Sequence, residues 1–317
     1  MRIVPSRGTL IATEHRFAGM TAPHTLPRSM WATLALLTLG WGLNWPMIKM
    51  ALTGVPVWTF RALCVAAGAV GMFLIARLSG LRIAVPEGQW PGMLLTAFFN
   101  VTLWNIFIAY GVHLLPSGRS AILAYTMPLW VVLLSALFLH ERITVRRLLG
   151  LTLGMGGMGL LIGGEFVGSR SSPAGALFVV SAALSWAVGT VLMKRFPISL
   201  PTTSFTAWQL LLGGAPIMVG ALGVDWGTWR PLTLKPAIGL GYNMIVGFVI
   251  CHWAWFQIAK GAPAGVASLS TLMIPVVGVF SGMLVLGERP GWEEYAALVL
   301  VILALATVVV PPRPVRR

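Results

Sequence analysis

A set of aromatic and polar side chains interrupts the long apolar stretches of this sequence, and these side chains could bind a solute. Aromatic faces stack on rings and attract cations, while amides, hydroxyls and a histidine supply hydrogen bonds. Such a set suits neutral, zwitterionic or cationic organic solutes, and it suits phosphorylated sugars poorly. For each residue, packing between helices is the alternative role. The candidate binding residues of this kind are Trp41, Asn44, Asn100, Trp104, Tyr125, Trp186, Tyr242, Asn243, His252, Trp255, Ser268 and Thr271.

Two lysines, Lys49 and Lys194, end apolar stretches at matched positions. Their default role is to extend the ammonium group to the lipid headgroups. The matched positions also suit contact with a substrate carboxylate, so both lysines join the candidate binding residues. Arg61 lies about 8 Å inside its stretch at 1.5 Å per residue. It is within reach of the headgroups, and we rank it below the lysines.

All eight acidic residues fall in tails, loops or the ends of apolar stretches. Because a charge inside a bilayer is costly, a carboxylate placed there usually serves proton coupling, and here a carboxylate relay is not expected. His252 is the deepest proton acceptor, either hydrogen-bonded to a neighbouring helix or a coupling group. The stretches lack paired carboxylates, a nucleophile beside a base and a metal cluster, so we expect no catalytic residues, metal or cofactor.

The elements that must position these residues are helices in lipid. With 57% hydrophobic and 9% charged residues and a mean hydropathy of +0.85, the 317-residue chain is too apolar for water. A spanning helix needs about 20 apolar residues. We expect the first, third, fourth, sixth, eighth and ninth of ten such stretches to line a central cavity. The ten are residues 31–50, 56–76, 92–111, 118–139, 147–164, 174–194, 203–222, 236–258, 265–286 and 293–311.

The net charge of +14 follows the positive-inside rule and does not require nucleic acid as a partner. A cytoplasmic N-terminus places fifteen lysines and arginines inside and six outside or at outer helix ends. Both termini of a ten-helix chain are then cytoplasmic. Residues 1–28 contain no apolar core of a signal peptide and are expected to form a flexible basic tail.

The sequence repeats itself at an offset of 145, which becomes 147 after two extra residues. We therefore expect two five-helix repeats, residues 29–165 and 173–312. Five is an odd number, so the second repeat enters the membrane in the opposite orientation, an architecture that supports alternating access. The matches include Trp41 with Trp186, Lys49 with Lys194, Phe60 with Phe205, Gly118 with Gly265, Pro128 with Pro275, and Glu141-Arg142 with Glu288-Arg289.

Pro128 and Pro275 lie at equivalent positions in the middle of their stretches. Each proline removes a hydrogen bond to the carbonyl four residues earlier, on Ala124 or Thr271, and predicts a kink. The freed carbonyls are candidates for gating or substrate binding, with a purely structural kink as the alternative.

The repeated pattern of Trp-to-Lys first helix, mid-helix proline and closing Glu-Arg resembles the EamA-type branch of the drug/metabolite transporter superfamily. The resemblance covers residues 31–311. It implies an all-α membrane protein of ten transmembrane helices that acts as a secondary carrier, often an exporter of amino acids or other metabolites. Bacterial aromatic amino acid exporters are the most similar branch. The second repeat departs from symmetry at Thr206, which stands opposite Arg61.

The sequence thus predicts a multi-pass protein of the bacterial inner membrane that exports small organic metabolites by alternating access. Amino acids, aromatic or hydrophobic, are the first substrates to test. The expected partners are a small-molecule substrate and the lipid bilayer, and a monomer is compatible with the sequence. The alternatives are export of drugs or other neutral and cationic metabolites, or a channel-like facilitator. A phosphate-ester antiporter is disfavoured because it would need several deep basic residues.

Overall fold

The computed structural model describes residues 28–167, 172–228, 231–261 and 264–309, and within these ranges the chain forms helices and no strand. The expected N-terminal tail lies outside the described residues, except for Arg28. The helices of the first half are α1 Arg28–Ala51, α2 Val57–Leu78, α3 Trp90–Ala97, η1 Phe98–Leu103, α4 Trp104–Leu114, α5 Ser117–Ala124, α6 Met127–Leu139 and α7 Val145–Val167.

The second half begins after residue 172. Its helices are α8 Pro173–Arg195, α9 Thr202–Val224, α10 Leu234–Tyr242, η2 Asn243–Ile250, α11 Cys251–Gly261, α12 Ala264–Leu286 and α13 Trp292–Val309. The segments η1 and η2 are π-helical, and each joins its two neighbouring α-helices into one continuous rod. Because η2 starts 145 residues after η1, both halves carry the wide turn at the same place in their third rod.

Helices α5 and α6 form one rod with a break at Tyr125 and Thr126. Pro128 follows directly as the second residue of α6, where its missing N–H is not needed. The expected kink is therefore a full interruption in the first half. Pro275, its counterpart, lies inside the uninterrupted helix α12.

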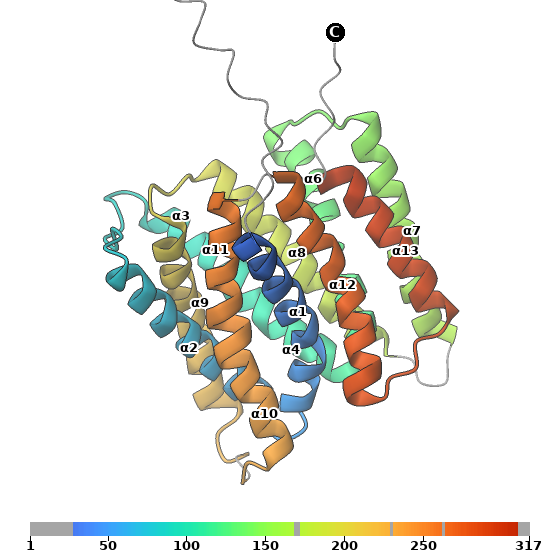
Figure 1. The fold of residues 1–317 in the computed structure, drawn as a ribbon, viewed down its shortest axis with the longest axis horizontal. Helices are drawn as coiled ribbons and strands as arrows, with labels where there is room; N and C mark the ends of the chain where they lie inside the picture. Colours follow the sequence, from blue (N-terminus) through green and yellow to red (C-terminus); the bar gives the residue numbers. More distant parts are fainter. Residues whose placement is uncertain (1–27, 168–171, 229–230, 262–263, 310–317) are drawn as a thin grey trace, which may run out of the picture.

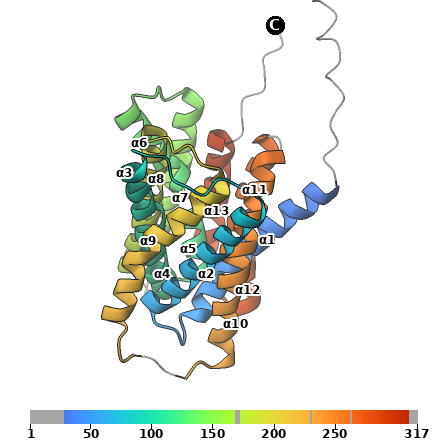
Figure 2. The same cartoon turned by 90° about the vertical axis from the view of Figure 1, so that its left-hand side faces the viewer.

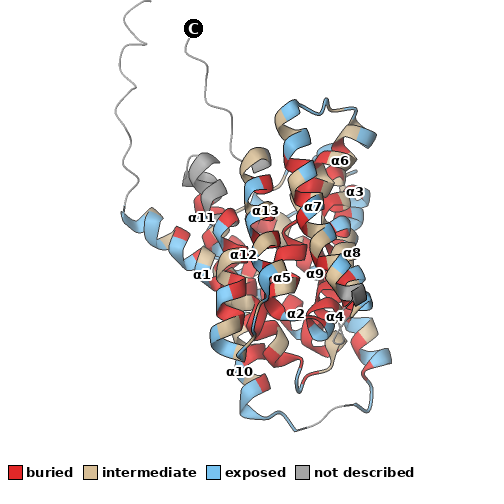
Figure 3. Cartoon of the chain, turned by 90° about the vertical axis from the view of Figure 1, so that its right-hand side faces the viewer, coloured by how far each residue is buried: buried red, intermediate tan, exposed pale blue. Residues whose placement is uncertain are grey.

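Seven of the helical rods in the described part of the chain are long and apolar enough to cross a membrane. The outer surface of the bundle is apolar as well, whereas the interior between the helices is buried (Figure 3). A soluble protein rarely exposes so many large apolar side chains, which require lipid here. The most exposed include Val70, Leu74, Leu137, Leu177, Val219, Leu222 and Leu284, all at least 55% exposed.

Successive rods run in alternate directions, so α1 begins and α13 ends at the same end of the bundle (Figures 1 and 2). Helix α8 therefore runs opposite to α1. We call the two ends of the bundle the Lys49 end, where α1 stops, and the Lys194 end, where α8 stops. Each end carries the lysine that closes the first rod of one half.

The packing between the halves follows a crossed pattern. Helix α1 packs on α10, α11 and α12, and α8 packs on α3, α4 and α6, so the first rod of each half contacts the third and fourth rods of the other. Helix α2 packs along α9, and α7 packs along α13. The first, third and fourth rods of both halves thus surround the centre of the molecule.

Candidate functional site

A cavity of about 170 Å³ lies in the centre of the bundle. For comparison, an apolar cavity of roughly 150 Å³ is large enough to admit benzene. The cavity lies between α1, α2, α4, the Tyr125 turn, α6, α8, η2 and α11. Its lining residues are Trp41, Asn44, Trp45, Ile48, Arg61, Trp104, Asn105, Ile108, Tyr125, Met127, Trp186, Gly247, Phe248 and His252.

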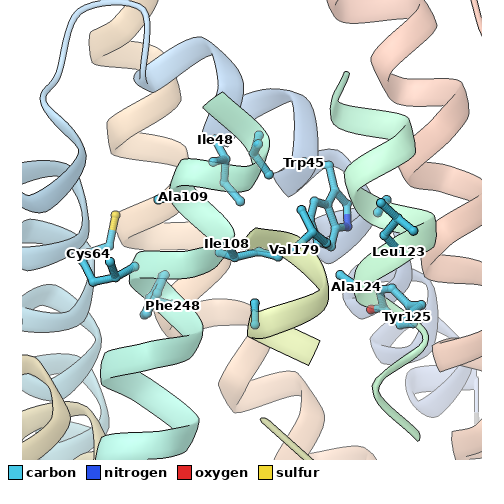
Figure 4. Close-up of a cluster of buried hydrophobic side chains, with 14 of the residues drawn as sticks. Trp45, Ile48, Cys64, Ile108, Ala109, Leu123, Ala124, Tyr125, Val179 and Phe248 are labelled. Atoms are coloured by element: carbon cyan, nitrogen blue, oxygen red, sulfur yellow. The ribbon is translucent and has the colours of Figure 1, made fainter. Parts of the chain in front are cut away.

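Aromatic rings from both halves form most of the cavity wall. Trp104 and Trp186 lie 5.1 Å apart, centroid to centroid, and join the third rod of the first half to α8. The rings of Trp45 and Tyr125 meet edge to face at 6.5 Å, and Figure 4 shows this pair beside Ile108. Trp41 meets the imidazole of His252 edge to face at 5.7 Å. Such walls stack well on a planar ring.

Arg61 lines the cavity, although its distance from the helix end ranked it below Lys49 and Lys194 as a binding candidate. Its side chain is only 2% exposed, because the fifth residue of α2 points into the bundle and not to the outer surface. The guanidinium carbon lies 4.8 Å from the ring centroid of Phe60. Among the described residues, neither Nε nor Nη2 of Arg61 has a hydrogen-bond partner. An arginine inside a membrane helix costs about 2.5–3.5 kcal/mol by insertion scales.

The backbone of η2 supplies a second polar feature. The carbonyl of Gly247 accepts a hydrogen bond from Trp41 Nε1 at 3.3 Å and lies 3.1 Å from His252 Nδ1. A carbonyl partner requires the hydrogen on Nδ1, which leaves His252 Nε2 as an acceptor. Asn44 packs against Gly247 so closely that a methyl group there would lie 2.8 Å from its Oδ1, and this oxygen has no hydrogen-bond partner.

Several predicted binding residues lie outside the cavity wall and contact neighbouring helices or the backbone of their own rod. Asn100 is buried against Gly189 of α8, and its Nδ2 lies 3.8 Å from the sulfur of Met193. Asn243 donates to the Gly239 carbonyl of its own rod at 2.9 Å, and Tyr242 donates its hydroxyl hydrogen to the Gly40 carbonyl at 2.9 Å. Trp255 lies behind Trp41, with ring centroids 6.2 Å apart.

The remaining assignments concern the ninth and second stretches. Ser268 and Thr271 belong to α12, but their side chains lie outside the described residues. No described residue of α12 contributes to the cavity wall, whereas α2, expected only to support the others, contributes Arg61. The sequence signal for Arg61 was an arginine one turn inside an apolar helix. The depth of Arg61 within its stretch indicates that the side chain can reach the headgroups. Depth alone does not show which face of α2 points into the bundle.

At the Lys49 end, Glu288 ties the loop after α12 to the start of α5. Its carboxylate accepts hydrogen bonds from Ser117 N at 2.6 Å, Ser117 Oγ at 3.0 Å and Gly118 N at 3.1 Å. The first amides of a helix have no partner within that helix, and its dipole favours an anion there. Lys49 donates to the carbonyl of Leu115 just before the same helix. The hydrogen bonds to Glu288 join the two halves, and the Lys49 contact ties α1 to the same loop.

At the Lys194 end, the corresponding groups form an exposed ion pair. Lys194 Nζ lies 2.7 Å from Glu141 Oε1 and 3.3 Å from Ser135 Oγ, and Arg147 approaches Glu141 Oε2 at 3.3 Å. The hydrogen bond from Lys194 holds the pKa of the Glu141 carboxyl below its ordinary value. Lys194 therefore contacts groups of the other half, whereas Lys49 donates to a carbonyl of its own half.

A recess of about 300 Å³ begins at this ion pair and leads inward. It shares Met127 and Trp186 with the central cavity, so these two side chains border both spaces. Pro128 lies in the wall of this recess, so the break between α5 and α6 lies beside the route from the Lys194 end to the cavity. The lining residues are Met127, Pro128, Val131, Val132, Ser135, Glu141, Arg147, Trp186, Thr190 and Lys194.

Several proteins of similar sequence are named as transporters or efflux pumps. The Bacillus subtilis protein named uncharacterized transporter YoaV is 26% identical over 254 residues, which cover 80% of this chain and 87% of that protein. A probable amino-acid metabolite efflux pump of Escherichia coli is 25% identical over 283 residues, 85% of this chain and 91% of its own length. A chain of known crystal structure shares the fold, with a TM-score of 0.62 at 20% identity, covering 88% of this chain and 96% of that chain.

Two separate segments of this chain, residues 29–163 and 173–310, match the EamA-like transporter family. The matched segments account for most of the sequence. The crossed packing of the helices and the apolar outer surface are those of a multi-pass membrane protein. This chain belongs to the EamA-like transporter family, in the drug/metabolite transporter superfamily.

Proposed function

We propose that this protein exports small organic metabolites across the bacterial inner membrane by alternating access, with aromatic or hydrophobic amino acids as the preferred class. The observation that carries the proposal is the unequal access to the central cavity. A recess leads from the Lys194 end to Met127 and Trp186 at the cavity wall. At the Lys49 end, Glu288 and Lys49 bind the start of α5. A recess of about 660 Å³ beside Glu288 at the Lys49 end shares no lining residue with the central cavity, whereas the recess at the Lys194 end shares two.

The proposed architecture is ten membrane-crossing rods in two inverted repeats. The double family match, the π-helical segment in the third rod of each half and the crossed packing support it. The opposite directions of α1 and α8 support the inversion (Figure 1). Exchange of conformations between inverted halves closes one end and opens the other.

The proposed orientation places the Lys194 end in the cytoplasm. This end carries more cations than the Lys49 end, which agrees with the positive-inside rule. In this orientation the structure is accessible from the cytoplasm, the side from which an exporter loads. Cations of the described residues at the Lys194 end are Arg28, Arg77, Arg82, Arg142, Arg146, Arg147, Lys194, Arg195 and Lys260, and those at the Lys49 end are Lys49, Arg119, Lys235 and Arg289.

The substrate class follows from the cavity wall and from the relatives. Indole and phenol rings surround a space of about 170 Å³, which fits one aromatic ring. A relative named as an amino-acid metabolite efflux pump supports amino acids as the first panel. Drugs and other neutral or cationic metabolites form the competing panel.

The test is uptake and counterflow of labelled amino acids in proteoliposomes that contain the purified protein. We expect saturable uptake and acceleration of labelled efflux by unlabelled substrate on the opposite side, because a carrier returns faster when loaded. Flux that rises linearly with concentration would replace the carrier with a channel-like facilitator. Saturable flux of amines or drugs, with none of amino acids, would assign the competing panel.

A further inference from the structure

We infer that Arg61 anchors the carboxylate of the cargo, so that the cavity selects aromatic carboxylates and zwitterions over aromatic cations. The inference rests on the proposed function only for the direction of transport. The binding claim depends on the cavity itself, in which one arginine, one unpartnered amide oxygen and several aromatic rings line a single space.

The first step of the argument is the unpaired state of Arg61. A buried arginine is ordinarily paired with a carboxylate or hydrogen-bonded to backbone oxygens. Within the described part of the chain, Arg61 forms no ion pair, and its stacking on Phe60 leaves the edge of the guanidinium unused. A charge at 2% exposure without an anionic partner among the described residues calls for an anion from outside.

The second step is the geometry of the unused donors. Nε–H and Nη2–H lie on the same edge of the planar guanidinium group, and this edge forms two parallel hydrogen bonds with a carboxylate. Both atoms are buried and lack a hydrogen-bond partner among the described residues, and the Arg61 side chain borders the cavity. One arginine balances one carboxylate charge, but it does not balance a phosphate ester.

The third step concerns the rest of the cargo. Asn44 Oδ1 has no partner, and His252 presents Nε2 as an acceptor when Nδ1 donates to Gly247. Two acceptors in the same cavity suit an ammonium group. The indole rings of Trp104 and Trp186 then receive the aromatic side chain. An amine without a carboxylate meets the same acceptors, but Arg61 repels it.

The fourth step is the position of Arg61 along the path. It lies four residues after the start of α2 at the Lys49 end, about 6 Å along the helix axis. Trp186 lies thirteen residues after the start of α8 at the same end, about 20 Å along that axis. A solute that arrives from the Lys194 end therefore passes Trp186 before its carboxylate reaches Arg61.

The first experiment uses the wild-type protein in detergent and reads binding as a shift of thermal unfolding. The probes share one phenyl ring: phenylalanine, 3-phenylpropionate and phenethylamine. We expect both carboxylates to stabilise the protein, with phenethylamine at least about tenfold weaker. Equal or tighter binding of phenethylamine would overturn the inference, and so would absence of binding by both carboxylates.

The second experiment compares Arg61→Gln, Arg61→Lys and the control Arg77→Gln, an exposed arginine of the same helix. Arg61→Gln should weaken binding of 3-phenylpropionate by about tenfold or more, and Arg61→Lys should restore part of it, because lysine keeps the charge but not the two-pronged edge. Arg77→Gln should bind as wild type does. Undiminished binding by a monodisperse Arg61→Gln protein would reject the anchor.

If Arg61→Gln does not fold, the lysine variant and the wild-type probe series decide the question. Addition of chloride to a buffer of low ionic strength without carboxylates tests the competing occupant. Displacement of 3-phenylpropionate by low chloride concentrations would assign the arginine to an inorganic anion and overturn the proposal.

The failure of the export hypothesis can be distinguished from the failure of the Arg61 anchor. Carboxylate-selective binding without flux rejects export and keeps the anchor, whereas saturable flux without carboxylate preference rejects the anchor and keeps export.

Discussion

Matched residues in the two halves of the molecule have unlike partners. Glu288 accepts three hydrogen bonds from the first residues of α5, while its counterpart Glu141 forms a half-exposed ion pair with Lys194. Pro128 follows a break between two helices, whereas Pro275 lies within one helix. A duplicated sequence therefore adopts two local structures at once. Under the proposed alternating access, each half would adopt both local structures in turn, one at each end of the bundle.

The largest expected effect on counterflow comes from a substitution at the Lys49 end. Glu288→Ala removes three hydrogen bonds and leaves two helix-start amides unpaired. A single charge-assisted bond contributes about 1.5–3 kcal/mol, so we expect counterflow to slow by about tenfold or more as the Lys49 end loses its closed state. The measurement is the initial counterflow rate in proteoliposomes. Glu87→Ala, at an exposed loop position, is the control. An unchanged rate for Glu288→Ala would remove the Lys49 end from the mechanism.

The next effect compares two glycine contacts between the halves. A methyl group on Gly189 would lie 1.9 Å from Asn100 Oδ1, whereas one on Gly247 would lie 2.8 Å from Asn44 Oδ1. Asn100 is buried, while Asn44 borders the cavity and can move into it. Gly189→Ala should therefore destabilise the protein by about 1–3 kcal/mol, and Gly247→Ala by less.

The measurement for these variants is the thermal unfolding temperature in detergent. Gly159→Ala serves as the control, because a methyl group there meets no atom within 4 Å. A larger decrease in the unfolding temperature for Gly247→Ala than for Gly189→Ala would contradict our interpretation. It would show that Asn44 at the cavity is held more rigidly than the buried Asn100.

A smaller effect separates the two prolines. Pro128→Ala restores an N–H that bonds to the carbonyl of Ala124 and joins α5 to α6. We expect counterflow to slow by about threefold, since a continuous helix is harder to bend beside the recess. Pro275→Ala changes a helix that is already continuous, so its effect should be smaller. Equal rates for both variants would mean that the break is not used during transport.

The smallest effect is at the Lys194 end. Glu141 and Lys194 are 33% and 45% exposed, and exposed pairs contribute about 0.2–1 kcal/mol, so Glu141→Gln should alter the rate less than about fivefold. Because the pKa of Glu141 is lowered, the ion pair is present above the ordinary carboxyl range and is lost only as the pH falls through the lowered value. Counterflow should be flat between about pH 5 and pH 8. A step in this range that disappears in Glu141→Gln would contradict the assignment.

The sequence was sufficient for features that depend on periodicity and composition. Apolar stretches of spanning length predicted the helical rods, and seven rods pass as membrane spans in the described chain. Trp41, Asn44, Trp104, Tyr125, Trp186 and His252 were selected because polar and aromatic residues inside apolar helices need a reason, and the structure places all six in one cavity wall. Their role in binding stays a prediction.

Features that depend on helix rotation and backbone detail were not accessible from the sequence. The inward face of α2 determines that Arg61 is buried, and α2 has little periodic contrast between its faces. The two π-helical segments turn Asn100 and Asn243 toward neighbouring backbone and side chains and away from the cavity. A regular helix of 3.6 residues per turn gives the wrong direction for residues beyond such a segment.

The π-helical segments also explain why the third rods contain polar residues. A wide turn releases carbonyl oxygens from the regular hydrogen-bond ladder, and the hydrocarbon of a bilayer offers no water to satisfy them. Asn105 Nδ2 lies 2.8 Å from the carbonyl of Val101, and Trp41 and His252 both reach Gly247. These side chains act as substitutes for solvent. Much of the polarity in the third rods therefore serves the backbone and would persist whatever the cargo.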